Sequence, residues 1–112
     1  MQLNHLNLTV TDVKAAVDFL VKYFDLQIGS TRGNAFAALF DDNGLVLTLM
    51  KGKLVSYPST FHIGFIQENK DRVNEINQRM KDDGFDVEPP QQSHGWTFYV
   101  QAPGGFTVEV LC

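Results

Sequence analysis

The segment APGGFTVEVL, residues 102–111, places a glutamate inside a predicted β-strand near the end of the chain. The strand alternates two sets of side chains, Phe106, Val108 and Val110 with Thr107, Glu109 and Leu111. Because successive side chains of a strand point to opposite faces, Glu109 does not share a face with the large apolar residues. A solvent-exposed glutamate on a one-sided sheet is one explanation. The rest of the sequence offers a second.

The first half of the chain predicts a strand, a helix and then two or three strands. HLNLTV, residues 5–10, alternates apolar and polar residues, which indicates a half-buried strand. Thr11 or Asp12 can cap a helix before Gly29, and its apolar stripe comprises Val13, Ala16, Val17, Leu20 and Phe24. NAFAALF and LVLTLM, on either side of the turn residues DDNG, then predict a hairpin.

The second half repeats this plan. FHIGFI, residues 61–66, predicts a strand, and Asn69 caps a helix that Gly84 ends. Its apolar stripe comprises Val73, Ile76 and Met80. WTFYVQ and FTVEVL form a second hairpin across APGG. The fold class is therefore α+β, with two βαβββ modules that form a curved mixed sheet with helices on its outer face.

Composition limits the function. A chain of 112 residues, 44% of them hydrophobic, fits one compact domain. No apolar run is long enough to span a membrane and no signal peptide is evident, so a cytoplasmic protein is expected. The net charge of −4, without a basic cluster, argues against nucleic-acid binding. Cys112 is the only cysteine, so any metal must bind to histidine and carboxylate. The expected partner is a small molecule or another copy of the chain.

Two histidines and Glu109 occupy matching places in the repeat. His5 and His62 open the first strands of the two modules on their polar faces, and Glu109 lies on the polar face of the last strand. These side chains are expected on the sheet face opposite the helices. Two imidazoles and one carboxylate form the facial ligand set of Fe(II) and similar divalent ions, with positions left open for substrate. A structural role for each histidine is the alternative.

The order of the modules, with NHLNLTV and FHIGFI opening them and APGGFTVEV closing the second, resembles the vicinal oxygen chelate superfamily. This superfamily includes glyoxalase I, extradiol dioxygenases, fosfomycin-resistance enzymes and bleomycin-binding proteins. The resemblance implies one glyoxalase/dioxygenase-like domain over residues 1–112, with modules at about 1–50 and 61–112. It implies metal-ligand positions at His5, Thr48, His62 and Glu109. The metal that it implies is a divalent ion of Fe, Mn, Ni, Co or Zn. Glyoxalase I has a carboxylate where Thr48 stands, so lactoylglutathione isomerisation is not expected.

The segment FYVQAPGGFTVE is similar to the closing signature of extradiol dioxygenases. That similarity implies that Tyr99 polarises a bound substrate oxygen and that His94 serves as an acid or base, although His94 lies closer to Tyr99 than the signature has it. Tyr99 and Phe98 as packing residues of a strand are the alternative.

Three functions follow from these observations. The first is a metal-dependent small-molecule enzyme, dioxygenase-like or lyase-like, with the metal held by His5, His62 and Glu109. The second is a metal-free drug-binding protein that resembles the bleomycin-resistance proteins. The third is a protein that has retained the metal-ligand residues but no longer uses them. A homodimer is expected, because modules in this superfamily pair either within one chain or between two.

Overall fold

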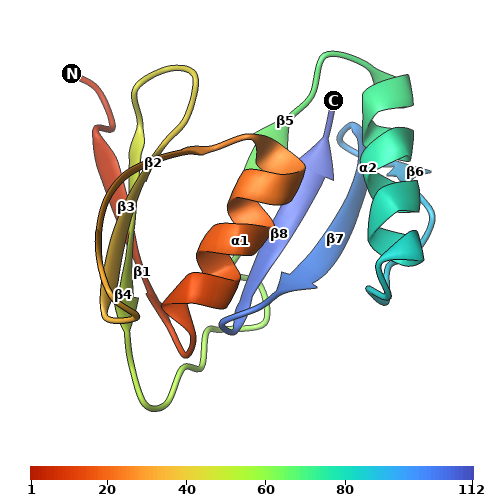
Figure 1. Cartoon of the computed structure of the whole chain (residues 1–112). Helices are drawn as coiled ribbons and strands as arrows, with labels where there is room; N and C mark the ends of the chain where they lie inside the picture. Colours follow the sequence, from red (N-terminus) through yellow and green to blue (C-terminus); the bar gives the residue numbers. More distant parts are fainter. The chain divides into compact units, whose positions relative to one another are not determined.

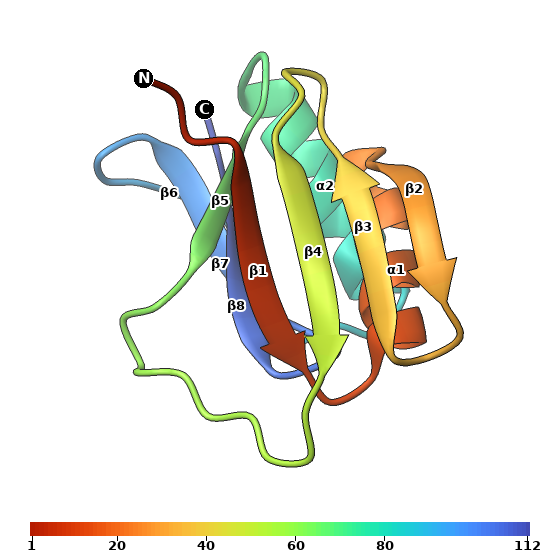
Figure 2. The same ribbon diagram turned by 90° about the vertical axis from the view of Figure 1, so that its left-hand side faces the viewer.

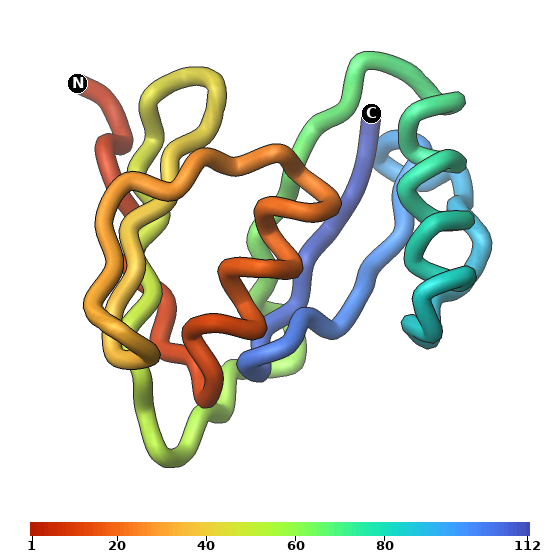
Figure 3. Tube along the Cα trace, viewed as in Figure 1, coloured from red at the N-terminus to blue at the C-terminus, as the bar shows by residue number.

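The computed structural model describes all residues, 1–112, and contains two compact units. The first comprises Met1–Tyr57 together with Ala102–Gly105, and the second comprises Pro58–Gln101 together with Phe106–Cys112. Each unit holds one helix and one four-stranded sheet. The chain can be followed through both in Figure 3, where red to yellow traces the first unit and green to blue traces most of the second. The two predicted βαβββ modules are confirmed.

The sheet of the first unit has the order β1-β4-β3-β2 (Figure 2). Its strands are β1 (His5–Val10), β2 (Gln27–Arg32), β3 (Phe36–Phe40) and β4 (Val46–Lys51). β1 pairs with β4 in parallel, whereas β3 pairs antiparallel with both β2 and β4. The predicted hairpin is therefore β3 and β4, and the undecided third strand is β2.

The helix α1 (Val13–Phe24) lies against β2, β3 and β4 of this sheet (Figure 1). Asp12 is its N-cap, because the carboxylate Oδ1 accepts a hydrogen bond of 3.1 Å from the amide of Ala15. The helix ends at Asp25, which adopts a left-handed conformation (φ 56°), and not near Gly29 as expected. Four of the five predicted stripe residues are buried, namely Val13, Ala16, Val17 and Leu20. Phe24 is only half-buried, and Phe19 and Tyr23 complete the buried face.

The sheet of the second unit repeats the first topology in the order β5-β8-β7-β6 (Figure 1). Its strands are β5 (Ile63–Ile66), β6 (Gln91–Gln92), β7 (Trp96–Ala102) and β8 (Phe106–Leu111). β5 pairs with β8 in parallel. The start of β7 and the end of β8 are paired antiparallel, because Trp96 and Cys112 exchange both backbone hydrogen bonds at 3.1 Å. The two-residue strand β6 is the third strand that the βαβββ plan requires after the helix, and its residues had not been assigned from the sequence.

The helix α2 (Lys70–Asp82) contacts β8. Asn69 caps it as predicted, with a bond of 2.9 Å from the amide of Arg72 to Oδ1. Its buried stripe, Val73, Ile76 and Met80, is completely enclosed. Gly84 follows the helix with φ 93°, which confirms the predicted stop. None of the helices is both long and apolar enough to cross a membrane.

The turn between β7 and β8 belongs to the first unit, although both strands that it joins belong to the second. The carbonyl of Gly104 accepts a hydrogen bond of 3.0 Å from the amide of Thr11. Gly104 has φ 104°, and a Cβ built on it would lie only 2.9 Å from Cβ of Val10. Glycine is thus required there both by the backbone conformation and by the close approach of β1.

Candidate functional site

Glu109 is the centre of a polar cluster in the second unit. Its neighbours on β8, Val108 and Val110, are fully buried on the opposite face, as the alternation predicts. Glu109 itself is only 4% exposed, so the solvent-exposed reading of this glutamate is wrong. A carboxylate is buried at this level only where polar groups compensate its lost hydration. Those groups come from β7, from the turn that precedes it and from the residue before β5.

Two of these groups bond to the same carboxylate oxygen. The hydroxyl of Thr97 on β7 donates to Oε2 at 2.6 Å. Nε2 of His94, in the turn before β7, donates to the same Oε2 at 2.5 Å. Tyr99 makes a smaller contribution that also lowers the pKa of the carboxyl group. Glu109 therefore lies in a preformed frame of donors.

The other oxygen, Oε1, lies 3.3 Å from Nε2 of His62. His62 lies directly before β5, which begins at Ile63. The sequence pattern had predicted that His62 opens this strand. Its Nδ1 donates to the backbone carbonyl of Thr60 at 3.0 Å, so in the neutral ring Nε2 carries a lone pair. A lone pair and a carboxylate oxygen that face each other are both acceptors. The pair is therefore favourable only with a proton or a cation between them.

Tyr99 lies beside this pair. Its ring meets the ring of His62 edge-on, with the centroids 5.4 Å apart, and the residue is 44% exposed. Its neighbour Phe98 is buried on the opposite face of β7. Of the two aromatic residues in the predicted signature, only Tyr99 therefore faces the cluster.

The electrostatics of the cluster favour an ionised Glu109 and a neutral Tyr99. Burial alone raises the pKa of Glu109, but the hydrogen bonds from Thr97 and His94, the charge of His94 and the hydrogen bond from Tyr99 together hold that pKa below its usual value. The pKa of Tyr99 is raised by desolvation first, then by the charge of Glu109 and by the hydrogen bond to it. The phenol thus keeps its proton at neutral pH.

His5, the third predicted ligand, lies in the first unit. It is exposed, and its Nδ1 bonds with Oδ1 of Asn4 at 3.1 Å. Since the amide oxygen can only accept, Nδ1 donates and Nε2 keeps the lone pair. Both predicted histidine ligands therefore have the same tautomer, with Nε2 available to a cation.

The strand registers support the alignment of the two modules. Thr48 on β4 lies opposite Asn7 on β1, and Glu109 on β8 lies opposite Gly64 on β5. His5 precedes Asn7 by two residues, and His62 precedes Gly64 by two. Thr48 is thus the counterpart of Glu109 in the first unit. Its hydroxyl donates to Oδ1 of Asn7 at 2.7 Å.

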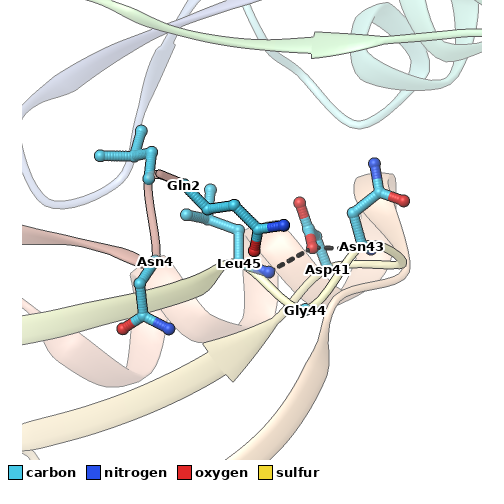
Figure 4. A pocket seen from close by; sticks show the side chains of 7 residues that line it. Gln2, Asn4, Asp41, Asn43, Gly44 and Leu45 are labelled. Atoms are coloured by element: carbon cyan, nitrogen blue, oxygen red, sulfur yellow. Dashed lines mark hydrogen bonds between the residues drawn. The ribbon is translucent and has the colours of Figure 1, made fainter.

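A groove of about 570 Å³ lies at the start of β1, beside the turn between β3 and β4 (Figure 4). The residues that line it are Gln2, Leu3, Asn4, Asp41, Asn43, Gly44 and Leu45. The Asp41 carboxylate in it already accepts from the amides of Asn43 and Leu45, at 2.9 and 2.8 Å. Asn4 lines this groove and is also hydrogen-bonded to His5, one of the predicted metal ligands.

The structure brings together Glu109, His62, Tyr99 and His94, all within the second unit. No group of three or more His, Cys, Asp or Glu side chains is arranged to hold a metal ion. Sequence reasoning missed Thr97. The available signal was the alternation of β7, which places Thr97 on the same strand face as Tyr99.

Comparisons with known proteins agree with this fold. Residues 2–110 match the profile of the Glyoxalase/Bleomycin resistance protein/Dioxygenase superfamily. A structure described as a possible glyoxalase from Bacillus cereus is 62% identical, with 100% of this chain and 99% of that chain covered and a TM-score of 0.97. None of the curated protein sequences matches the chain.

More distant structures share the fold. The fosfomycin resistance protein FosX from Listeria monocytogenes, in a mutant form complexed with Mn(II) and dihydroxypropylphosphonic acid, is 22% identical, with 98% of this chain and 90% of that chain covered and a TM-score of 0.83. Lactoylglutathione lyase from Agrobacterium tumefaciens is 18% identical, with 98% and 92% covered and a TM-score of 0.77.

Proposed function

The chain belongs to the Glyoxalase/Bleomycin resistance protein/Dioxygenase superfamily, and from this premise we propose that it is a divalent-metal-dependent enzyme acting on a small molecule. The metal is held by His5, His62 and Glu109, and the chemistry is of the vicinal oxygen chelate type, dioxygenase-like or lyase-like. The third ligand, His5, comes from the first unit of the same chain or of a second copy.

The observation that carries the proposal is the pair formed by His62 and Glu109. Two ligand atoms bound to one divalent ion at about 2.0 to 2.2 Å lie roughly 2.8 to 3.6 Å apart for octahedral to tetrahedral angles. The 3.3 Å between Nε2 of His62 and Oε1 of Glu109 is within this range. The backbone carbonyl of Thr60 fixes the ring of His62 in the tautomer that a metal requires. The spacing and the tautomer support His62 and Glu109 as two of the three proposed ligands.

A divalent ion bound there supplies Lewis acidity to two adjacent substrate oxygens. The chain's own residues then orient the substrate. Tyr99 is half-exposed, keeps its proton and lies edge-on to His62, so its hydroxyl is the candidate donor to a substrate oxygen if it turns from Glu109 to the substrate. The side chain of His94 is exposed in the turn before β7. His94 is the candidate for proton transfer, because its Nε2 bonds to Glu109 and its Nδ1 can then face solvent.

Relatives of the same fold support a metal and a small, oxygen-rich substrate. FosX was crystallised with Mn(II) and a dihydroxypropylphosphonic acid, which carries two hydroxyl groups. Thr48 argues against the lactoylglutathione lyase reaction for this chain, since a neutral hydroxyl replaces the anionic fourth ligand expected of glyoxalase I.

Metal content is the direct test of the proposal. Protein purified without chelator is expected to contain about one divalent ion per chain, drawn from Fe, Mn, Ni, Co and Zn, because the three ligands together form one site. Elemental analysis after gel filtration measures the ratio. Apoprotein that takes up none of the five ions on titration would favour the alternative, a metal-free small-molecule binding protein of the bleomycin-resistance type.

Thr48→Glu tests the correspondence between the modules. If Thr48 occupies the vacant fourth ligand position, the substitution adds an anionic ligand and tightens Mn(II) binding by about ten-fold or more. Calorimetric titration of apoprotein measures the change, and Thr48→Gln, which has the same length without the charge, is its control. An unchanged affinity would mean that the position is not beside the metal.

A homodimer is part of the proposal, and the site is either within one chain or shared between two. Sedimentation at micromolar concentration distinguishes dimer from monomer. Mixing His5→Ala chains with Glu109→Ala chains then locates the site: a shared site restores one intact centre in each heterodimer, whereas a site within one chain restores none. A monomer that still binds metal would contradict both the dimer and the shared site.

A further inference from the structure

The two oxygens of Glu109 have different surroundings. Oε2 accepts hydrogen bonds from the Thr97 hydroxyl at 2.6 Å and from Nε2 of His94 at 2.5 Å. Oε1 faces Nε2 of His62 at 3.3 Å. A carboxylate oxygen has about two lone-pair positions, so the two donors occupy both positions of Oε2. Oε1 is then the oxygen left for a cation on the side of His62.

We propose, building on the metal-dependent function above, that Thr97 is a positioning residue that restricts Glu109 to one-oxygen coordination of the metal. A carboxylate that binds through both oxygens would take an additional coordination position. With three single-atom ligands, an octahedral ion would keep three positions open, which would be enough for two adjacent substrate oxygens and one water or oxygen molecule. The hydroxyl of Thr97 thereby preserves the space in which a substrate chelates.

Thr97 is better suited to this role than His94. Thr97 is 6% exposed and lies within β7, so its hydroxyl is held in place by the strand and competes with little water. The His94 side chain is 53% exposed in a turn, where water can replace its hydrogen bond. Tyr99 contributes less to the lowered pKa of Glu109 and, at 44% exposed, lies at the exposed side of the cluster. The buried, geometrically fixed contact is therefore that of Thr97.

Thr97→Val tests the proposal, because it keeps the shape of the side chain and removes the donor. It is expected to weaken Mn(II) binding to the apoprotein by about 10- to 100-fold, the usual effect of losing a group that orients a ligand. Thr97→Ser, which keeps the hydroxyl, is expected to restore most of the affinity. Thr107→Val is the matched control on the same hairpin, since Thr107 only accepts a bond from Gln101. Calorimetry gives the affinities.

The absorption bands of bound Co(II) provide a second measurement, because their intensity depends on the coordination number. Thr97→Val should change these bands if Glu109 then binds through both oxygens, whereas a thermal melt of the apoprotein reports any purely structural loss. Wild-type protein that binds metal with the same affinity and the same Co(II) spectrum as Thr97→Val would overturn this inference alone. Wild-type protein that binds no metal would overturn the metal-dependent function and this inference with it.

Discussion

Replacing Glu109 with alanine is expected to weaken Mn(II) binding by at least about 100-fold, more than the loss of an orienting group. The carboxylate is the only anionic member of the proposed ligand set, and without it two neutral imidazoles leave the charge of the ion uncompensated. The substitution also removes the acceptor for the buried hydroxyl of Thr97. Titration of apoprotein with Mn(II), followed by calorimetry, measures the loss.

Two further variants make this experiment specific. Glu109→Gln keeps the size and one acceptor oxygen but not the charge, so it separates the electrostatic contribution from packing. Glu88→Ala removes an exposed carboxylate outside the cluster and should leave the affinity unchanged. If Glu109→Ala binds Mn(II) with the affinity of the wild type, Glu109 is not a ligand of the proposed site.

The largest stability effect is expected at Gly104. An alanine there has to adopt φ near 104° and brings its Cβ to 2.9 Å from that of Val10. The backbone strain costs about 1 to 3 kcal/mol and the steric overlap a further 1 to 3 kcal/mol, so the free energy of unfolding should fall by about 2 to 6 kcal/mol. Urea denaturation followed by circular dichroism measures it.

Gly84 offers a matched control for this prediction. It too has a positive φ, of 93°, but an added Cβ would meet no atom within 4 Å. Gly84→Ala should therefore show only the backbone cost of about 1 to 3 kcal/mol. If both glycine variants lose the same stability, close approach to Val10 contributes nothing and the turn has room for a side chain.

Most of the fold was predictable because its signals are local. Alternation identified β1 and β8, cap residues such as Asn69 identified a helix start, and the two hairpins followed from turn residues. The errors have local causes as well. Asp25 ends α1 by adopting a left-handed conformation that is uncommon outside glycine, so Gly29 was the wrong stop signal. β6 is too short for any periodicity.

The candidate site was only partly predictable, since pairing of distant strands decides it. His62 and Glu109 could be placed on one face by alternation, and the structure brings them together. Alternation could have placed Thr97 on the face of Tyr99, but its bond to Glu109 could not be predicted, because that bond depends on the register of β7 against β8. The role of His5 as a third ligand stays a prediction, as does the metal.

The turn at Ala102–Gly105 has a consequence for how the protein folds. Those four residues complete the first unit, yet they lie at least 45 residues (102 − 57) beyond Tyr57 along the chain. Contacts between residues so far apart in sequence form late and slow a folding reaction. Residues 1–57 are thus expected to leave Val10 and the amide of Thr11 uncovered until residues 102–105 fold against them. The first unit is expected to complete its folding only together with this distant turn.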